Sequence, residues 1–278
     1  MIQYNGKAVD INHFPDGTLL IKETVENKEN AVLCWKFESN EETVALYFLT
    51  KHLQAKGVER IVLELPYIPN ARQDRVKAPE DVFTLKYFAE FINSLGFAEV
   101  RVLDPHSYVS EALFDNLRIG TPKEYVEQVI ACLGGTEKLL LFFPDEGAMK
   151  RYSSMFDLPY VFGIKKRDWT TGEILGLDVA GRTELIAGSR ILIVDDICSR
   201  GGTFFYSAKE LKSLGADRIY LYVSHCENTI LEGELPSTDF IERIFTTDSI
   251  FTGAHEKISV LKSVGREEKQ WKEPILCC

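Results

Sequence analysis

The stretch ILIVDDICSRGGT, residues 191–203, decides the fold that we expect for this chain. Its first four residues are aliphatic, which is typical of a strand buried on both faces in a parallel sheet. The Gly-Gly-Thr at its end leads into a segment with helical spacing over residues 203–214. A buried strand that is followed directly by a helix predicts one unit of an α/β protein.

The polar residues of this stretch predict a ligand site, because ligands bind beyond the carboxyl ends of the strands in an open parallel sheet. Asp195 and Asp196 can accept hydrogen bonds from vicinal hydroxyls of a sugar. Gly201 and Gly202 let backbone N–H groups approach an anion, and Thr203 adds a hydroxyl at the positive end of the helix dipole. The pattern indicates a sugar that carries a phosphate. The alternative is a helix start with aspartate caps and a flexible glycine pair.

The rest of the chain repeats the alternation of strands and helices, which predicts an α/β fold with mainly parallel sheets flanked by helices. A turn and a helix-initiating proline at 120–122 divide an N-terminal domain, 1–120, from a C-terminal domain, 121–249. The tail, 250–278, is a candidate to pack back on the first domain. Weak periodicity and glycines predict a mobile excursion over 168–189. The expected strands cover 31–35, 60–65, 99–103, 138–143, 160–164, 190–194 and 218–223, and the expected helices cover 42–56, 82–95, 122–132, 147–156 and 203–214.

The composition argues against several classes of function. The 278 residues include 32 Lys and Arg against 42 Asp and Glu, a net charge of -10, which disfavours nonspecific binding to nucleic acid. No apolar run approaches the roughly 20 residues that cross a bilayer, and the first residues lack the apolar core of a secretory signal. We therefore expect a cytoplasmic protein with no membrane partner, whose six cysteines are reduced.

Charged side chains follow two other predicted strands. The stretch LPYIPNARQDR, residues 65–75, places Arg72, Gln73 and Asp74 in a loop after a buried strand. Arginine is suited to bidentate phosphate binding, so this loop predicts contact with a polyphosphate, although a solvated charged loop is an equal alternative. His106 follows the next strand, where a lone histidine is more often structural than functional.

Taken together, these segments resemble the ribose-phosphate diphosphokinase (PRPP synthetase) family. ILIVDDICSRGGT looks like the phosphoribosyl-diphosphate-binding motif that this family shares with phosphoribosyltransferases, and LPYIPNARQDR resembles the family's LPY-x-x-ARQDR signature. Four more segments resemble the family's motifs and occur in its order: FPDG at 14–17, DPHS at 104–107, PDEG at 144–147 and KKR at 165–167. The resemblance implies two phosphoribosyltransferase-like domains, each with a mainly parallel sheet flanked by helices.

The resemblance also implies a reaction, in which the C1 hydroxyl of ribose 5-phosphate attacks the β-phosphorus of ATP in the presence of Mg2+. The products are 5-phosphoribosyl 1-diphosphate and AMP. Phe14 and Asp16 would reach the ATP of a neighbouring subunit, which implies a homo-oligomer. The implied roles are catalytic for Lys165 and Arg167; ATP-binding for Phe14, Asp16, Arg72, Gln73, Asp74 and His106; ribose-5-phosphate-binding for Asp195, Asp196, Ser199, Arg200, Gly201, Gly202 and Thr203; and metal-binding for His106 and Asp145.

Three positions depart from the family's pattern. Thr18 stands where the family has Glu, and Ser199 and Arg200 stand where it has Asp and Thr. The segment before FPDG is also shorter than in the family. Two rival functions stay open: a catalytically weak regulatory protein of diphosphokinase type, which Ser199 and Thr18 favour, and a phosphoribosyltransferase, which explains 191–203 but not the ARQDR stretch.

Overall fold

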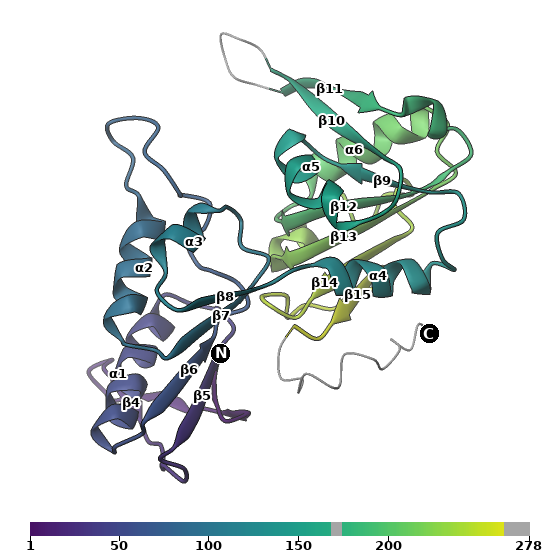
Figure 1. Ribbon diagram of the computed structural model, residues 1–278. Helices are drawn as coiled ribbons and strands as arrows, with labels where there is room; N and C mark the ends of the chain where they lie inside the picture. Colours follow the sequence, from purple (N-terminus) through teal and green to yellow (C-terminus); the bar gives the residue numbers. More distant parts are fainter. Residues whose placement is uncertain (168–173, 264–278) are drawn as a thin grey trace. The chain divides into compact units, whose positions relative to one another are not determined.

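The computed structural model describes residues 1–167 and 174–263 (Figure 1), and the side chains at 165–177 are outside that description. The chain forms two compact units, which are divided between Thr121 and Pro122. Unit 1 holds Met1–Thr121 and unit 2 holds Pro122–Lys262. This division lies next to the boundary expected between residues 120 and 121.

The sheet of unit 1 has six strands in the order β2-β1-β5-β6-β7-β8. Strands β5 to β8 are parallel to one another, whereas β1 is antiparallel to both of its neighbours. Figure 1 shows α1 and α2 along one face of this sheet. The elements are β1 (Ile2–Tyr4), β2 (Lys7–Ala8), the hairpin strands β3 (Ile11–His13) and β4 (Leu19–Ile21), β5 (Asn30–Trp35), α1 (Glu41–Ala55), β6 (Arg60–Glu64), α2 (Thr84–Ser94), β7 (Glu99–Leu103), α3 (Val109–Leu113) and β8 (Leu117–Gly120).

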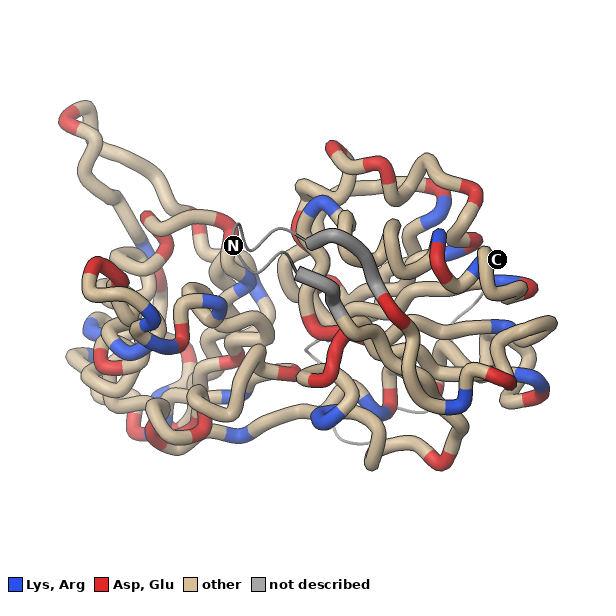
Figure 2. Tube along the Cα trace, turned by 90° about the horizontal axis from the view of Figure 1, so that it is seen from above, with Lys and Arg blue, Asp and Glu red and all other residues tan. Residues whose placement is uncertain are grey.

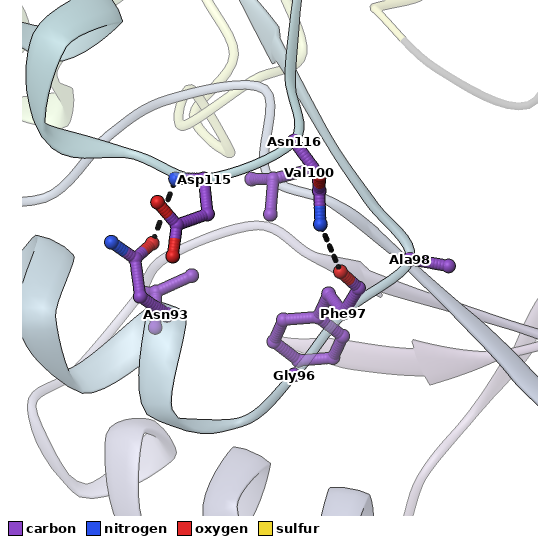
Figure 3. Close-up of a pocket in the computed structure, with 8 residues that line it drawn as sticks. Asn93, Gly96, Phe97, Ala98, Val100, Asp115 and Asn116 are labelled. Atoms are coloured by element: carbon purple, nitrogen blue, oxygen red, sulfur yellow. Dashed lines mark hydrogen bonds between the residues drawn. The ribbon is translucent and has the colours of Figure 1, made fainter.

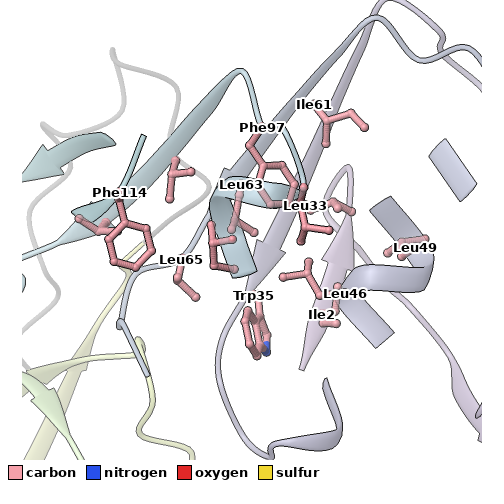
Figure 4. Packing of buried hydrophobic residues seen from close by; sticks show 14 of the residues in the cluster. Ile2, Leu33, Trp35, Leu46, Leu49, Ile61, Leu63, Leu65, Phe97 and Phe114 are labelled. Carbon is pink, nitrogen blue, oxygen red and sulfur yellow. The ribbon is translucent and has the colours of Figure 1, made fainter. Parts of the chain in front are cut away.

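The core of unit 1 lies between this sheet and its helices (Figure 4). Leu33 on β5, Leu63 on β6 and Leu46 on α1 are all 0% exposed. Trp35 ends β5 in the same core, and its Nε1 donates a hydrogen bond of 2.9 Å to Oε2 of Glu42. A buried indole N–H needs an acceptor, so this bond ties the carboxyl end of β5 to the start of α1.

The sheet of unit 2 has seven strands in the order β11-β10-β9-β12-β13-β14-β15. Every neighbouring pair is parallel except β10 and β11. The elements are α4 (Lys123–Cys132), β9 (Leu139–Phe143), α5 (Glu146–Tyr152), β10 (Tyr160–Arg167), β11 (Ile174–Gly181), β12 (Arg190–Cys198), α6 (Gly202–Ser213), β13 (Arg218–Cys226), β14 (Arg243–Thr247) and β15 (Ile258–Leu261), with short 3-10 turns at Ser153–Met155, Thr183–Leu185 and Asn228–Glu232.

Both faces of the unit 2 sheet are buried around β12, as its aliphatic run predicts. Ile191 and Ile193 share a core with Phe204 and Ala208 of α6. The alternate residues of the strand point to the opposite face, and Val194 there is also 0% exposed. The predicted α/β architecture, with mainly parallel sheets flanked by helices, is confirmed for both units.

The structure differs from several of the sequence-based expectations. The prediction of a mobile excursion over 168–189 is wrong for residues 174–181, which form strand β11. Residues 168–173 lie outside the described residues. The strand expected to end at 194 continues to Cys198, so the two acidic residues lie on β12 itself. Within the tail, β15 pairs with β14 in unit 2, whereas Ser263 belongs to unit 1, and 264–278 lie outside the described residues.

Acidic and basic positions alternate along both units in the view of Figure 2, without one extended basic face in that view. Over residues 1–167 and 174–263, no helix combines the length and the apolar character needed to cross a membrane.

Candidate functional site

The candidate site of unit 2 lies where three neighbouring parallel strands end. Phe142 of β9 is in register with Ile193 of β12, and Phe143 of β9 with Phe162 of β10. Parallel strands end at the same edge of a sheet, so the residues just beyond these positions gather there. Asp145 follows β9 at this edge, Asp195 lies on β12, and the backbone of residues 165–167 continues β10.

The centre of this edge is an aspartate pair. Asp195 is half-buried and Asp196 is buried, and the Asp196 N–H donates to Oδ1 of Asp195 over 3.0 Å. Burial, the Asp196 carboxylate and, more weakly, the Asp145 carboxylate raise the pKa of Asp195 well above its ordinary value. Like charges held together in a partly desolvated place are costly without a cation or donor nearby. The pair is therefore suited to bind a cation or hydroxyl groups.

Arg151 is the internal partner of this pair, and the sequence did not assign it a role. Its Nη1 lies 3.3 Å from Oδ2 of Asp196, with only 16% of its side chain exposed. The guanidinium also stacks over the ring of Tyr152 at 4.9 Å. Arg151 stands on α5, whose N-cap is Asp145, with Oδ1 accepting from the Ala148 N–H over 3.0 Å. The PDEG segment at 144–147 thus starts the helix that carries Arg151.

The loop that follows β12 has the shape expected of an anion-binding turn. Gly201 is the N-cap of α6 with φ +82, a left-handed conformation that strongly favours glycine. A Cβ at Gly201 would lie 2.7 Å from Cδ2 of Leu235, so a larger residue would also clash there. A Cβ at Gly202 would meet open space, and Thr203 is half-buried at the start of the helix. The first N–H groups of α6 are suited to an anion.

Ser199 and Arg200, which depart from the family's pattern, both contact the 3-10 turn at Asn228–Glu232. The Ser199 and Thr229 hydroxyls lie 3.2 Å apart. Nη2 of Arg200 donates to Oε2 of Glu232 over 2.9 Å, and both side chains are well exposed. The structure therefore places the predicted sugar-phosphate residues 195–203 along one continuous path, from the end of β12 to the start of α6.

The predicted ATP-binding loop of unit 1 contains one acid with a strong internal partner. Asp74 is buried, and it accepts hydrogen bonds from Nε and Nη2 of Arg75 over 2.7 and 2.8 Å. These bonds are the main reason why the pKa of Asp74 is lowered to about 2. Arg72 and Gln73 are exposed, and Oε1 of Gln73 accepts from the Thr84 hydroxyl over 2.9 Å. Because Arg75 occupies both Asp74 oxygens, Asp74 is suited to shape this loop.

His106 follows β7 and lies close to the same loop. Its charge contributes, as the weakest cause, to the lowered pKa of Asp74. The preceding Asp104 has φ +41, an uncommon conformation for a residue other than glycine, at the point where the chain leaves β7. The structure thus brings together His106 and Asp74, two of the predicted ATP-side residues.

The FPDG segment forms the turn between β3 and β4. Phe14 is 49% exposed at the start of this turn. Oδ1 of Asp16 accepts hydrogen bonds from the Thr18 hydroxyl over 2.7 Å and from the Thr18 N–H over 3.0 Å, which lower the pKa of Asp16. Thr18, which stands where the family has Glu, therefore stabilises this turn through its two hydrogen bonds to Asp16.

For some of the predicted site residues, the described part of the structure does not show that they lie together. The side chains of Lys165 and Arg167 lie outside the described residues, although their backbone belongs to β10. The two predicted metal ligands belong to different units, His106 to unit 1 and Asp145 to unit 2. Among the residues whose side chains are described, no group of three or more His, Cys, Asp or Glu side chains is arranged to hold a metal ion.

A pocket of about 280 Å³ in unit 1 contains none of the predicted site residues (Figure 3). Its polar side chains already support neighbouring turns: Oδ1 of Asn93 accepts from the Asp115 N–H over 3.0 Å, and Nδ2 of Asn116 donates to the Phe97 carbonyl over 3.0 Å. These bonds are drawn in Figure 3. The pocket is therefore a structural hollow beside the end of α2.

Comparisons with known proteins agree with this arrangement. Residues 2–96 match the N-terminal domain of ribose phosphate pyrophosphokinase, and 149–257 match the phosphoribosyl transferase domain. A ribose-phosphate pyrophosphokinase of Thermococcus kodakarensis is 30% identical over 228 residues, covering 78% of this chain and 77% of the relative. One of Sulfolobus acidocaldarius is 28% identical over 229 residues, covering 79% and 77%.

Among solved structures, phosphoribosylpyrophosphate synthetase from Mycobacterium smegmatis has the same fold, with a TM-score of 0.75 and 17% identity over 92% of this chain and 86% of that chain. The fold and the matched domains define a protein of phosphoribosyltransferase type. Within that class, the chain belongs to the ribose-phosphate pyrophosphokinase family, as its motifs predict.

Proposed function

We propose that the protein transfers the diphosphoryl group of ATP to the C1 hydroxyl of ribose 5-phosphate, giving 5-phosphoribosyl 1-diphosphate and AMP. Membership of the family supports this reaction, and one observation carries it: the aspartate pair of β12 leads directly into the Gly201 turn at the start of α6. That path offers acceptors for sugar hydroxyls at one end and N–H donors for a phosphate at the other.

On the sugar side, Asp195 and Asp196 accept hydrogen bonds from the ribose hydroxyls. Arg151 holds Asp196 through its 3.3 Å contact, so it orients one member of the pair from within the fold. The backbone of Gly201 and Gly202 and the hydroxyl of Thr203 bind the 5-phosphate. Positioning of this kind is the main contribution that a protein makes to phosphoryl-type transfers.

The donor set of unit 2 fits Mg2+. Carboxylate oxygens are its preferred protein ligands, and it is usually held by one or two carboxylates together with substrate phosphates. Burial and the Asp196 carboxylate raise the pKa of Asp195, and a bound cation would favour its charged form. Asp195 and Asp196 would hold Mg2+, with Asp145 as a further candidate in unit 2, and His106 is a separate candidate ligand in unit 1. When bound, Mg2+ would neutralise charge on the phosphate oxygens.

On the nucleotide side, Arg72, Gln73 and His106 bind ATP, and Asp74 acts by fixing Arg75 in the same loop. Phe14 and Asp16, on the exposed turn between β3 and β4, reach the ATP bound by another copy of the chain. The proposal therefore includes a homo-oligomer of at least two subunits in the cytoplasm.

Lys165 and Arg167 stabilise the charge that develops on the transferred diphosphoryl group. Their backbone continues β10, the neighbour of β9 on the side opposite β12, so they belong to the same carboxyl edge as Asp145. Fixed cations at such an edge act most strongly where water is excluded.

Product analysis by phosphorus NMR tests the reaction. With ATP, Mg2+ and ribose 5-phosphate, the protein should form AMP and a C1-linked diphosphate in equal amounts. ADP as the product would contradict a diphosphoryl transfer. Consumption of 5-phosphoribosyl 1-diphosphate with a free base would favour a phosphoribosyltransferase, and no turnover alone together with stimulation of an active relative would favour a regulatory protein.

A further inference from the structure

The turn at Asn228–Glu232 and the residues around it form a wall behind the anion-binding loop. We call residues 227–235 the backing segment. The Glu227 N–H donates to the Cys198 carbonyl over 2.8 Å, at the point where β12 ends. Gly233 packs so closely against the Arg200 carbonyl that a Cβ there would collide with it, although its φ of -93 suits any residue. The backing segment therefore fixes the backbone of the loop.

The backing segment also carries acidic side chains beside a loop that is built for an anion. Oε2 of Glu227 accepts from the Thr229 hydroxyl over 3.2 Å, and the Thr229 hydroxyl lies 3.2 Å from that of Ser199. Glu232 holds the guanidinium of Arg200 at 2.9 Å. A carboxylate at this place lowers the affinity of the loop for a phosphate, because it pairs with the guanidinium of Arg200.

We propose that Glu232 is a specificity-determining residue of the anion-binding loop, because it competes with the sugar phosphate for the guanidinium of Arg200. Arg200 directly precedes Gly201, the N-cap of α6, so a modest rotation of its side chain moves its charge between the two partners. The Arg200 and Glu232 side chains are 70% and 60% exposed, so the exchange needs no buried charge to be uncovered. A phosphate of charge -2 attracts Arg200 more strongly than one carboxylate does.

This competition makes the loop selective for a ligand with a full phosphate group. A weaker anion, such as a sugar carboxylate, does not displace Glu232 from Arg200. The guanidinium of Arg200 therefore stays paired with Glu232 and does not bind that anion. The proposal rests on the proposed function for the identity of the ligand. It deepens that function by explaining how Arg200, which stands where the family has Thr, acts at the site.

The test measures the dissociation constant of ribose 5-phosphate by calorimetry and, in parallel, its KM and kcat for AMP formation, using the full chain. Glu232→Gln should tighten binding and lower KM by about twofold to fivefold, the range of an exposed ion pair, with kcat and the KM for ATP unchanged. Arg200→Gln should weaken binding about tenfold or more, because a charge-assisted bond to phosphate is lost. Glu234→Gln is the matched control, as Glu234 is an exposed acid of the same segment, and it should change binding by less than about 1.5-fold.

The double variant R200Q/E232Q decides whether Glu232 acts through Arg200. It should bind ribose 5-phosphate no better than Arg200→Gln alone. If the double variant binds ribose 5-phosphate more tightly than Arg200→Gln alone, the effect of Glu232 is a general charge effect, and the proposal is overturned. Unchanged or weaker binding of ribose 5-phosphate by Glu232→Gln would also overturn the proposal. Binding without AMP formation would overturn the proposed reaction only, whereas a wild-type chain that binds no ribose 5-phosphate would overturn this proposal too.

Discussion

Asp74 in unit 1 and Asp195 in unit 2 are both aspartates, but their surroundings shift their pKa values in opposite directions. Asp74 in unit 1 is buried, and Arg75 satisfies both of its oxygens, so its pKa falls to about 2. Burial and, after it, the neighbouring Asp196 carboxylate raise the pKa of Asp195 in unit 2. The first arrangement stabilises the fold, whereas the second costs stability. A pair of carboxylates at the edge of a parallel sheet is a candidate place for a ligand to bind.

The edge that holds Asp195 should lose most activity when Lys165, a proposed catalytic cation, is removed. Lys165→Ala should lower kcat for AMP formation by about 100-fold to 1000-fold, the usual cost of losing one preorganised charge at a developing anion. Circular dichroism should show an unchanged fold. Lys166→Ala is the matched control and should retain activity within about threefold, because the proposed mechanism gives Lys166 no role. Equal losses in both variants would mean that the edge needs only general positive charge.

The loop that holds Asp74 should respond in stability. Asp74→Asn removes the charged acceptor of two hydrogen bonds and should lower the free energy of unfolding by about 2 kcal/mol in urea titrations. Asp81→Asn is the control in the same loop. Its side chain is half-buried and accepts from the Lys77 and Ala78 N–H groups, which an asparagine oxygen can also do. A loss in Asp74→Asn no larger than that of the control would show that the Arg75 contact is weak.

The anion-binding loop offers a comparison between two adjacent glycines. Gly201→Ala should lower the free energy of unfolding by about 1–3 kcal/mol, because it forces an alanine into φ +82 and against Leu235. Gly202→Ala, where a Cβ meets open space, should stay within about 0.5 kcal/mol of the wild type. Thermal or urea unfolding measures both. If the two variants were equally stable, the left-handed turn would not be required.

The smallest effect that we predict concerns pH. Asp74 has a lowered pKa, so its stabilisation is fully present above the ordinary aspartate value and is lost as pH falls toward about 2. Asp195 has the opposite sign: its raised pKa makes stability fall as pH rises from the ordinary aspartate value through the raised one. The stability of the wild type minus that of Asp195→Asn should therefore decrease as pH rises above the ordinary aspartate pKa of about 4. A flat difference would mean that Asp195 titrates normally.

The parallel sheets could be predicted from the sequence because the central strands are long, continuous aliphatic runs. ILIV on β12 and IVLEL around β6 do not alternate between apolar and polar residues. Such continuous runs are typical of strands that are covered on both faces. The short strands β1 to β4 were missed, because two or three residues carry no readable period. β11 was missed because its glycines and polar residues resemble a loop, and its pairing with β10 supplies what local propensity lacks.

The candidate site could be located from the sequence, but not its internal contacts. Motif order placed Asp195 and Gly201 on the correct path from a strand to a helix. Arg151 was given no role, because its contact with Asp196 joins residues that are far apart in the sequence. The pairing of Arg200 with Glu232 was missed for the same reason. Such contacts depend on the packing of elements rather than on local pattern.

Asp195→Asn tests the central claim most directly when turnover and stability are measured on the same preparation. The asparagine removes a like charge from the pair, so the free energy of unfolding at neutral pH should rise by about 1 kcal/mol. AMP formation from ATP and ribose 5-phosphate should fall by about 100-fold or more, because the cation and the ribose lose an acceptor. A variant that is less stable than the wild type, or one that keeps its turnover, would contradict the account of this edge as a site held ready for its substrate.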